Sequence, residues 1–173
     1  MKKSFALTSA LSALLLLASC GNDDAETAAK NLRSEIVANS AMASTTSITE
    51  EQADCVADGM VERIGVDDLR DYDILTKDLK VNQGIENVEM GRGDADALAD
   101  ILIECIDIEA LFEKQFTAGT TAAALTADQQ DCVGKAVTED VIRKILTSTF
   151  QGEKNGAYAA LQDQMMECAR GEE

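Results

Sequence analysis

The sequence contains no histidine, no proline and no tryptophan, and aromatic residues make up only 3% of its 173 residues. Without histidine the chain lacks the commonest general base and the usual serine or cysteine triads, so we expect no catalytic residues and no enzyme activity. Zinc sites rely on histidine or on closely spaced cysteines, and the chain has no Cys-x-x-Cys pair. We therefore expect no resident metal and no cofactor.

The scarcity of aromatic residues also constrains the core, which has to be built from Ala, Val, Ile, Leu and Met. Hydrophobic residues make up 46% of the chain and recur in regular patterns, so we expect a folded core. With few aromatics, no proline and much Ala, Leu and Glu, the composition favours helix over sheet. The predicted fold class is all-α.

Positive charge is scarce as well. The chain has 15 Lys and Arg against 32 Asp and Glu, which gives a formal net charge of −17. Nucleic-acid binding needs clustered Lys and Arg, so we expect no nucleic-acid partner. The same imbalance argues against a surface that lies flat on anionic lipid. It could instead attract cationic proteins, peptides or divalent ions, although solubility alone also accounts for it.

The first twenty residues have the order of an export signal. Lys2 and Lys3 provide a positive start, residues 5–18 carry no charge, and small residues precede Cys20. A basic start, an apolar stretch and small residues at the cleavage site are typical of a secretory signal peptide. The apolar run is too short for a transmembrane helix, which needs about 20 residues.

The end of this signal, Leu17-Ala18-Ser19-Cys20, resembles the lipobox of bacterial lipoproteins. The resemblance implies that residues 1–19 are removed, that diacyl or triacyl chains such as palmitate attach to Cys20, and that the membrane is a partner through this lipid anchor. It implies a place outside the cytoplasm, on the cell membrane or the outer membrane, and Gly21 favours onward sorting. Two or more acyl chains suffice for stable anchoring.

Residues 20–47 are predicted to be the lipidated N-terminus and a flexible tether. Residues 21–26 are polar and acidic, and residues 39–47 are rich in Ser, Thr and Ala. Between them, Ala28 to Val37 could form a short helix. Small polar linkers of this kind keep an anchored domain mobile, so we expect the body to stand off the membrane.

From Ile48 onward the chain repeats itself. Residues 48–56 (ITEEQADCV) are echoed by residues 125–133 (LTADQQDCV), with Thr, Gln, Asp, Cys and Val at the same places. In each copy the threonine can accept a hydrogen bond from the N–H three residues later while the glutamine reaches back, which is a capping box. The repeat predicts two helical units, residues 48–124 and 125–173. The helix caps are Thr49 with Gln52 and Thr126 with Gln129.

The cysteines continue the repeat, because each unit has one early in its first helix and another late in its last helix. Besides Cys20, four cysteines in an exported chain indicate two structural disulfides, for which three pairings are possible. If each unit is a separate hairpin, Cys55 pairs with Cys105 and Cys132 with Cys168. Redox or metal roles have less support, since a reactive thiol usually has a neighbouring cysteine or positive charge.

Acidic clusters offer a further candidate, a calcium site. Neither cluster matches the EF-hand pattern of alternating Asp, a central Gly and a closing Glu. We therefore expect these acids to cap helices and to face solvent. The clusters are Asp67, Asp68, Asp71 and Asp73, and then Asp94, Asp96 and Asp100.

The two units loosely resemble small secreted helical modules of uncharacterised bacterial lipoproteins, a resemblance that implies no activity. We expect a non-catalytic module that binds an unknown protein or ligand partner through a groove between the units. The alternative is an acidic envelope protein that binds divalent cations through its acidic clusters. A hydrolase with paired carboxylates is the third hypothesis.

Overall fold

The computed structural model describes residues 21–42, 48–83, 88–108, 111, 126–153 and 156–170. Over these residues it contains seven α-helices and no β-strand, which confirms the all-α prediction. The predicted signal peptide and Cys20 lie outside the described residues. The helices are α1 (Gly21–Met42), α2 (Glu50–Arg63), α3 (Val66–Asp71), α4 (Arg92–Cys105), α6 (Ala127–Ala136), α7 (Glu139–Phe150) and α8 (Gly156–Arg170).

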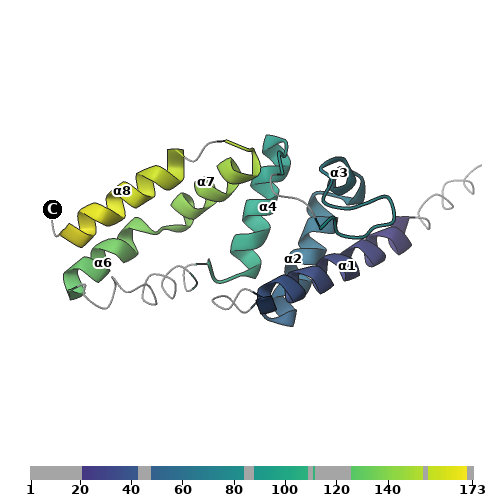
Figure 1. Cartoon of the computed structure of the whole chain (residues 1–173), viewed down its shortest axis with the longest axis horizontal. Coiled ribbons are helices and arrows are strands. Elements are labelled where there is room, and N and C mark those ends of the chain that lie inside the picture. The colour runs from purple at the N-terminus through teal and green to yellow at the C-terminus, as the bar shows by residue number, and fades with distance from the viewer. Residues whose placement is uncertain are drawn as a thin grey trace, which may run out of the picture.

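The helices form an elongated body (Figure 1). Helices α1, α2 and α3 lie at one end, α6 and α8 lie at the other, and α4 and α7 pack side by side between them. The chain enters α1 at one extremity of the long axis and leaves α8 at the opposite one. The helices do not follow one another along the molecule in chain order, because α7 lies between α4 and the pair formed by α6 and α8.

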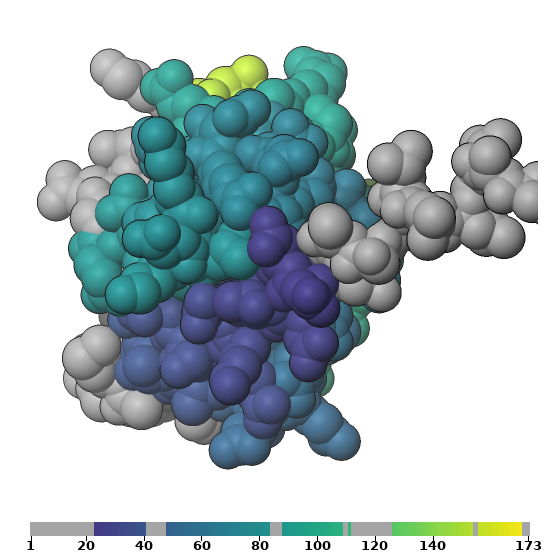
Figure 2. Space-filling view, turned by 90° about the vertical axis from the view of Figure 1, so that its right-hand side faces the viewer, coloured from purple at the N-terminus to yellow at the C-terminus, as the bar shows by residue number. Residues whose placement is uncertain are grey.

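The prediction of a flexible tether is wrong for Gly21–Met42, which forms the single continuous helix α1. This helix packs along α2, with Ala28 fully buried and Leu32 only 3% exposed. Figure 2 looks onto the end where α1 begins and shows its purple start lying against the blue and teal segments that follow α2. The apolar side of this helix is narrow and its other residues are mostly small or polar, so its composition resembles that of a linker. The first unit therefore begins at α1.

Both predicted capping boxes are present. The Thr49 hydroxyl accepts a hydrogen bond from the Gln52 N–H at 3.2 Å, and the Gln52 side chain accepts one from the Thr49 N–H at 3.0 Å. Thr126 and Gln129 form the same pair at 3.3 and 2.8 Å. Such bonds satisfy N–H groups that the first turn of a helix leaves without partners. In both copies of the repeat, the helix therefore begins directly after the equivalent threonine, Thr49 or Thr126.

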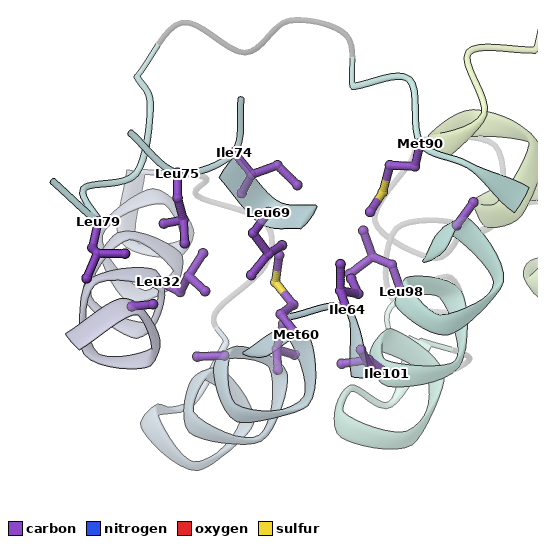
Figure 3. Packing of buried hydrophobic residues seen from close by; sticks show 14 of the residues in the cluster. Leu32, Met60, Ile64, Leu69, Ile74, Leu75, Leu79, Met90, Leu98 and Ile101 are labelled. Atoms are coloured by element: carbon purple, nitrogen blue, oxygen red, sulfur yellow. The ribbon is translucent and has the colours of Figure 1, made fainter. Parts of the chain in front are cut away.

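The first unit holds most of the buried apolar side chains, and all of those described are aliphatic residues or methionine. Leu69 on α3 and Ile101 on α4 are almost completely buried, with 0% and 1% exposure. Figure 3 shows side chains from α1, α2, α3 and α4 and from the loop after α3 meeting in one cluster. Among them are Leu32, Met60, Ile64, Leu69, Ile74, Leu75, Leu79, Met90, Leu98 and Ile101.

Helices α2 and α4 run antiparallel and touch closely at two successive turns. The Cys55–Cys105 disulfide joins them with Cα atoms 5.6 Å apart. One turn further along α2 is Gly59, which faces Ile101. A Cβ atom added to Gly59 would lie 2.9 Å from Ile101 Cγ2, closer than a normal van der Waals contact. The glycine therefore lets the two helices approach to the distance that the disulfide requires.

The second unit repeats this arrangement with far less apolar packing. The Cys132–Cys168 disulfide joins α6 and α8 with Cα atoms 5.5 Å apart. The Gln129 amide donates a hydrogen bond to the Ala169 carbonyl at 2.6 Å, which fixes the same antiparallel pairing. Both disulfides have the pairing that two hairpin units predict. The buried cluster here is small and consists of Ala136, Ile145 and Leu161.

We expect Gly59→Leu to lower the free energy of unfolding by about 1–3 kcal/mol, because the added side chain overpacks a contact that cannot move apart. The matched control is Gly134→Leu on α6, where a Cβ atom would meet nothing within 4 Å. That change should leave stability unchanged or raise it by up to about 1 kcal/mol, because glycine is a poor helix former. Urea unfolding followed by circular dichroism measures both. Equal destabilisation by the two changes would contradict the close-approach role of Gly59.

Replacing Cys132 and Cys168 together by alanine should cause local unfolding of the second unit. Closing a loop of this length stabilises by roughly 4 kcal/mol on the chain-entropy model, a large amount beside so small a core. Hydrogen exchange measured by mass spectrometry should show α6 and α8 losing protection while α1, α2 and α4 keep theirs. The matched variant replaces Cys55 and Cys105, where the larger core should retain part of the protection. Uniform loss across the molecule in the first variant would show that the units unfold as one.

Candidate functional site

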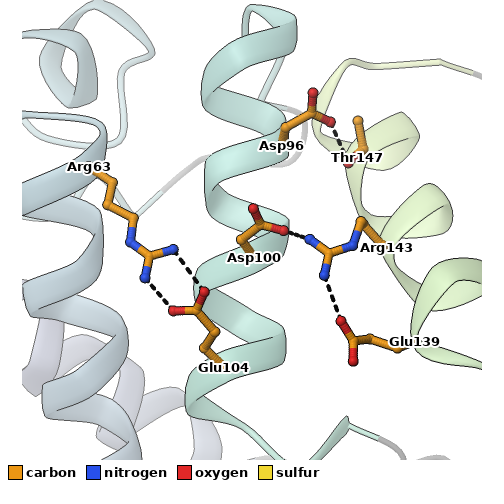
Figure 4. A network of polar contacts seen from close by, with 7 residues as sticks. All are labelled: Arg63, Asp96, Asp100, Glu104, Glu139, Arg143 and Thr147. Carbon is orange, nitrogen blue, oxygen red and sulfur yellow. Dashed lines mark hydrogen bonds and ion pairs between the residues drawn. The ribbon is translucent and has the colours of Figure 1, made fainter.

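The two units meet where α7 packs against α4 (Figure 4). The Arg143 guanidinium on α7 lies between two carboxylates, with an ion pair to Asp100 on α4 and another to Glu139 at 2.7 Å. One turn away, the Thr147 hydroxyl donates a hydrogen bond to Asp96 at 3.0 Å. The units are therefore joined through side chains from the middle of both helices.

The same interface continues beyond the ends of these helices. The Met90 N–H, just before α4, donates a hydrogen bond to the Phe150 carbonyl at 2.7 Å. The Phe150 side chain, at the end of α7, packs against the core of the first unit. Because apolar and polar contacts both cross it, the interface orders the units relative to each other. The two hairpins are consequently not separate bodies, although each has its own disulfide.

At the other end of this interface, the end of α4 and the start of α7 enclose a groove of about 460 Å³. We call it the inter-unit groove. Its apolar lining includes Ile103 and Ile106 from the first unit and Ile142 from the second. Carboxylates of Glu104, Asp107 and Glu139 lie in the same lining.

The sequence explains why these side chains gather there. Helix α4 ends at Cys105, and Ile106 is already in an extended conformation with φ −124° and ψ 129°. The chain therefore changes from helix to extended backbone inside the groove, and the disulfide at Cys105 holds that point against α2. Thr138 caps the start of α7 by accepting a hydrogen bond from the Val141 N–H, which places Glu139 and Ile142 in the first turn.

Two of the groove carboxylates, those of Glu104 and Glu139, are ion-paired at its edges. Arg63 on α2 donates two hydrogen bonds to the Glu104 carboxylate, both drawn in Figure 4. This bonding lowers the pKa of Glu104 below its usual value and raises the pKa of Arg63. Among the described lining residues there is no lysine or arginine. The lining therefore presents isoleucine side chains and carboxylates, with the guanidinium groups of Arg63 and Arg143 beside them.

The acidic clusters that the sequence singled out have other surroundings. Asp67 pairs with Arg70 at 3.1 Å on the surface of α3. The Asp94 carboxylate accepts a hydrogen bond from the Tyr72 hydroxyl at 2.6 Å, and this bond raises the pKa of Tyr72. Across the described ranges, no group of three or more Cys, Asp or Glu side chains is arranged to hold a metal ion. Asp67 and Asp94 thus take part in separate structural contacts and do not converge on one site.

The groove was not predicted residue by residue. The repeat predicts a groove between the units, but it indicates neither Ile103, Ile106 and Ile142 nor Glu139 as its lining. The run from Ile103 to Ile108, in which isoleucines alternate with acids and Cys105, carries a local signal for such a surface. The contribution from the start of α7 has no signal in sequence, because it depends on how α7 packs against α4.

A second groove lies between α1 and α2 and has a volume of about 430 Å³. Leu32 and Ile36 of α1, Met60 of α2, Ile48 and Val81 form most of its lining. This lining is almost entirely apolar and holds a single carboxylate, that of Glu35. The inter-unit groove can select a ligand by charge as well as by apolar contact, because several carboxylates lie in its lining.

We expect Glu104→Gln to lower stability near neutral pH and to have no effect in strong acid. The pKa of Glu104 is lowered in the folded state, so its contribution is present above the ordinary carboxyl range and is lost as pH falls through the lowered pKa. Urea midpoints across an acid-to-neutral series measure this. Glu167→Gln is the matched control, because Glu167 precedes Cys168 as Glu104 precedes Cys105 but makes no ion pair with a described residue. A pH-independent effect of Glu104→Gln would contradict the ion pair as its cause.

Comparison with known protein families, curated proteins and solved structures finds no match to this chain.

Proposed function

We propose that this chain is a lipid-anchored protein of the bacterial cell envelope, without catalytic activity, that binds a cationic and partly apolar partner in the inter-unit groove. The observation that carries the proposal is the lining of that groove. Ile103 and Ile108 are partly exposed and provide its apolar surface, whereas Ile106 and Ile142 are almost buried. Three carboxylates lie in the same lining. A concave surface where apolar side chains and converging polar groups lie together is a usual form of a binding site.

The charge of the chain supports a cationic partner. The formal net charge is −17, so a positively charged peptide or protein segment would be attracted from a distance and would arrive faster at low salt. Within the groove, isoleucine side chains would contact the apolar part of such a segment. A side chain with a long apolar stem and a positive end, as in Lys or Arg, matches both parts of the lining.

Several features support a place outside the cytoplasm. The lipobox-like sequence that ends at Cys20 supports lipid anchoring. Two disulfides are compatible with an oxidising compartment, where such bonds persist. Within the described ranges, no helix has both the length and the apolar character needed to cross a bilayer. In this proposal, lipid on Cys20 holds the body at the membrane.

The test is binding of a fluorescent peptide of alternating lysine and leucine, measured by anisotropy. We expect Glu139→Gln to weaken binding by about 1 kcal/mol, roughly fivefold in Kd. Glu153→Gln is the matched control, since it makes the same change in charge at an exposed residue that does not line the groove. Ile103→Ser should weaken binding as well, because it removes apolar contact.

The outcomes distinguish binding in the inter-unit groove from general electrostatic attraction to the acidic protein. If Glu139→Gln and Glu153→Gln weaken binding equally, the peptide follows net charge and the inter-unit groove is not the site. A peptide of alternating glutamate and leucine should fail to bind. Thermal unfolding of each variant shows whether the α4–α7 interface is intact, because Glu139 also pairs with Arg143.

A further inference from the structure

Helix α1 includes Gly21, the residue that directly follows the proposed lipid-bearing cysteine. We propose that the bilayer surface lies directly against the end of the molecule formed by the start of α1 and by α3, with no tether between them. The proposal rests on lipidation of Cys20, as proposed above. It identifies the headgroup layer as the partner of this end face.

Helix α1 cannot act as a swinging arm, because several contacts hold it to the body. Ala28 and Leu32 are buried against α2. Near its first turn, Asp24 pairs with Arg70 of α3 at 3.2 Å. In its middle, the Asn31 amide donates a hydrogen bond to the Leu79 carbonyl at 2.8 Å. These contacts cover the first half of the helix, so the body is rigidly connected to its N-terminal end.

The resulting distance is short. Consecutive Cα atoms are about 3.8 Å apart, so Gly21 stays beside the lipid-bearing residue. The polar layer on each side of a bilayer is about 5–8 Å thick, so the first turn of α1 would lie at headgroup level. A flexible chain over residues 21–47 would instead have a mean end-to-end distance of roughly 30 Å. The helix removes that freedom.

Figure 2 shows the face that would meet the headgroups, with the purple start of α1 beside the blue and teal segments that follow α2. Asp23, Asp67 and Asp68 are exposed on α1 and α3. The turn that begins at Thr76 and carries Lys77 and Lys80 follows α3 and contacts the middle of α1 through Leu79. Acids outnumber cations here, so zwitterionic headgroups would suit this face better than anionic ones.

The opposite end of the molecule would point away from the membrane. In Figure 1 the C-terminal end of α8 lies at the far extremity of the long axis from the start of α1. Tyr158 on α8 is 43% exposed, so it provides a reporter position in the second unit. Asp68 on α3 provides the reporter position near the anchor, and its side chain is also exposed.

The experiment uses the full-length lipidated protein in phosphatidylcholine vesicles that contain an alkyne-tagged lipid. The photo-crosslinker p-benzoylphenylalanine replaces either Asp68 or Tyr158. We expect lipid crosslinking several-fold higher at Asp68 than at Tyr158. A flexible Gly/Ser insertion between Cys20 and Gly21 should reduce crosslinking at Asp68 toward the Tyr158 level, because it restores a tether.

Mass spectrometry of the N-terminal peptide reports separately whether Cys20 carries diacylglycerol. If Cys20 is lipidated and the two positions crosslink equally, the direct seating is overturned while the anchor stands. If Cys20 carries no lipid, both the seating and the anchor are overturned, whereas peptide binding in the inter-unit groove remains a separate measurement. High crosslinking at Asp68 that the insertion abolishes, with lipid present on Cys20, supports the proposal.

Discussion

The packing of α4 between α2 and α7 is the constraint on which the rest of the structure depends. On one side the disulfide at Cys105 and the contact of Ile101 with Gly59 hold α4 against α2. On the other side Asp96 and Asp100 bind α7. A helix fixed on both sides transmits the geometry of the first unit to the second. The inter-unit groove exists because α4 ends where α7 begins.

Features encoded by short, local patterns could be predicted from sequence. Thr49 and Gln52 define a capping box within four residues, and the second copy repeats it. The pairing of Cys55 with Cys105 followed from the same repeat, since equivalent residues in two units occupy equivalent places. The helical class followed from composition. In each case the information lay in spacing along the chain and needed no knowledge of which helices touch.

Features that depend on tertiary contacts could not be predicted. The apolar stripe of α1 is narrow, and Ala28 is a small residue that is equally common in linkers, so only its burial against α2 shows that it belongs to the core. The role of Gly59 depends on Ile101 facing it from another helix. Glu139 reaches the groove only because α7 packs on α4. Local sequence predicts the helices, whereas the site depends on the contacts between them.

Among the four cysteines after Cys20, the two disulfides join neighbours in chain order, Cys55 with Cys105 and Cys132 with Cys168. A polypeptide that emerges from a translocation channel N-terminus first would therefore present each cysteine with its native partner before the next pair appears. Oxidation in that order needs no later exchange of partners, a process that proceeds by thiolate attack on an existing disulfide. If the chain is exported as proposed, this sequential pairing would allow oxidative folding during export without an isomerase.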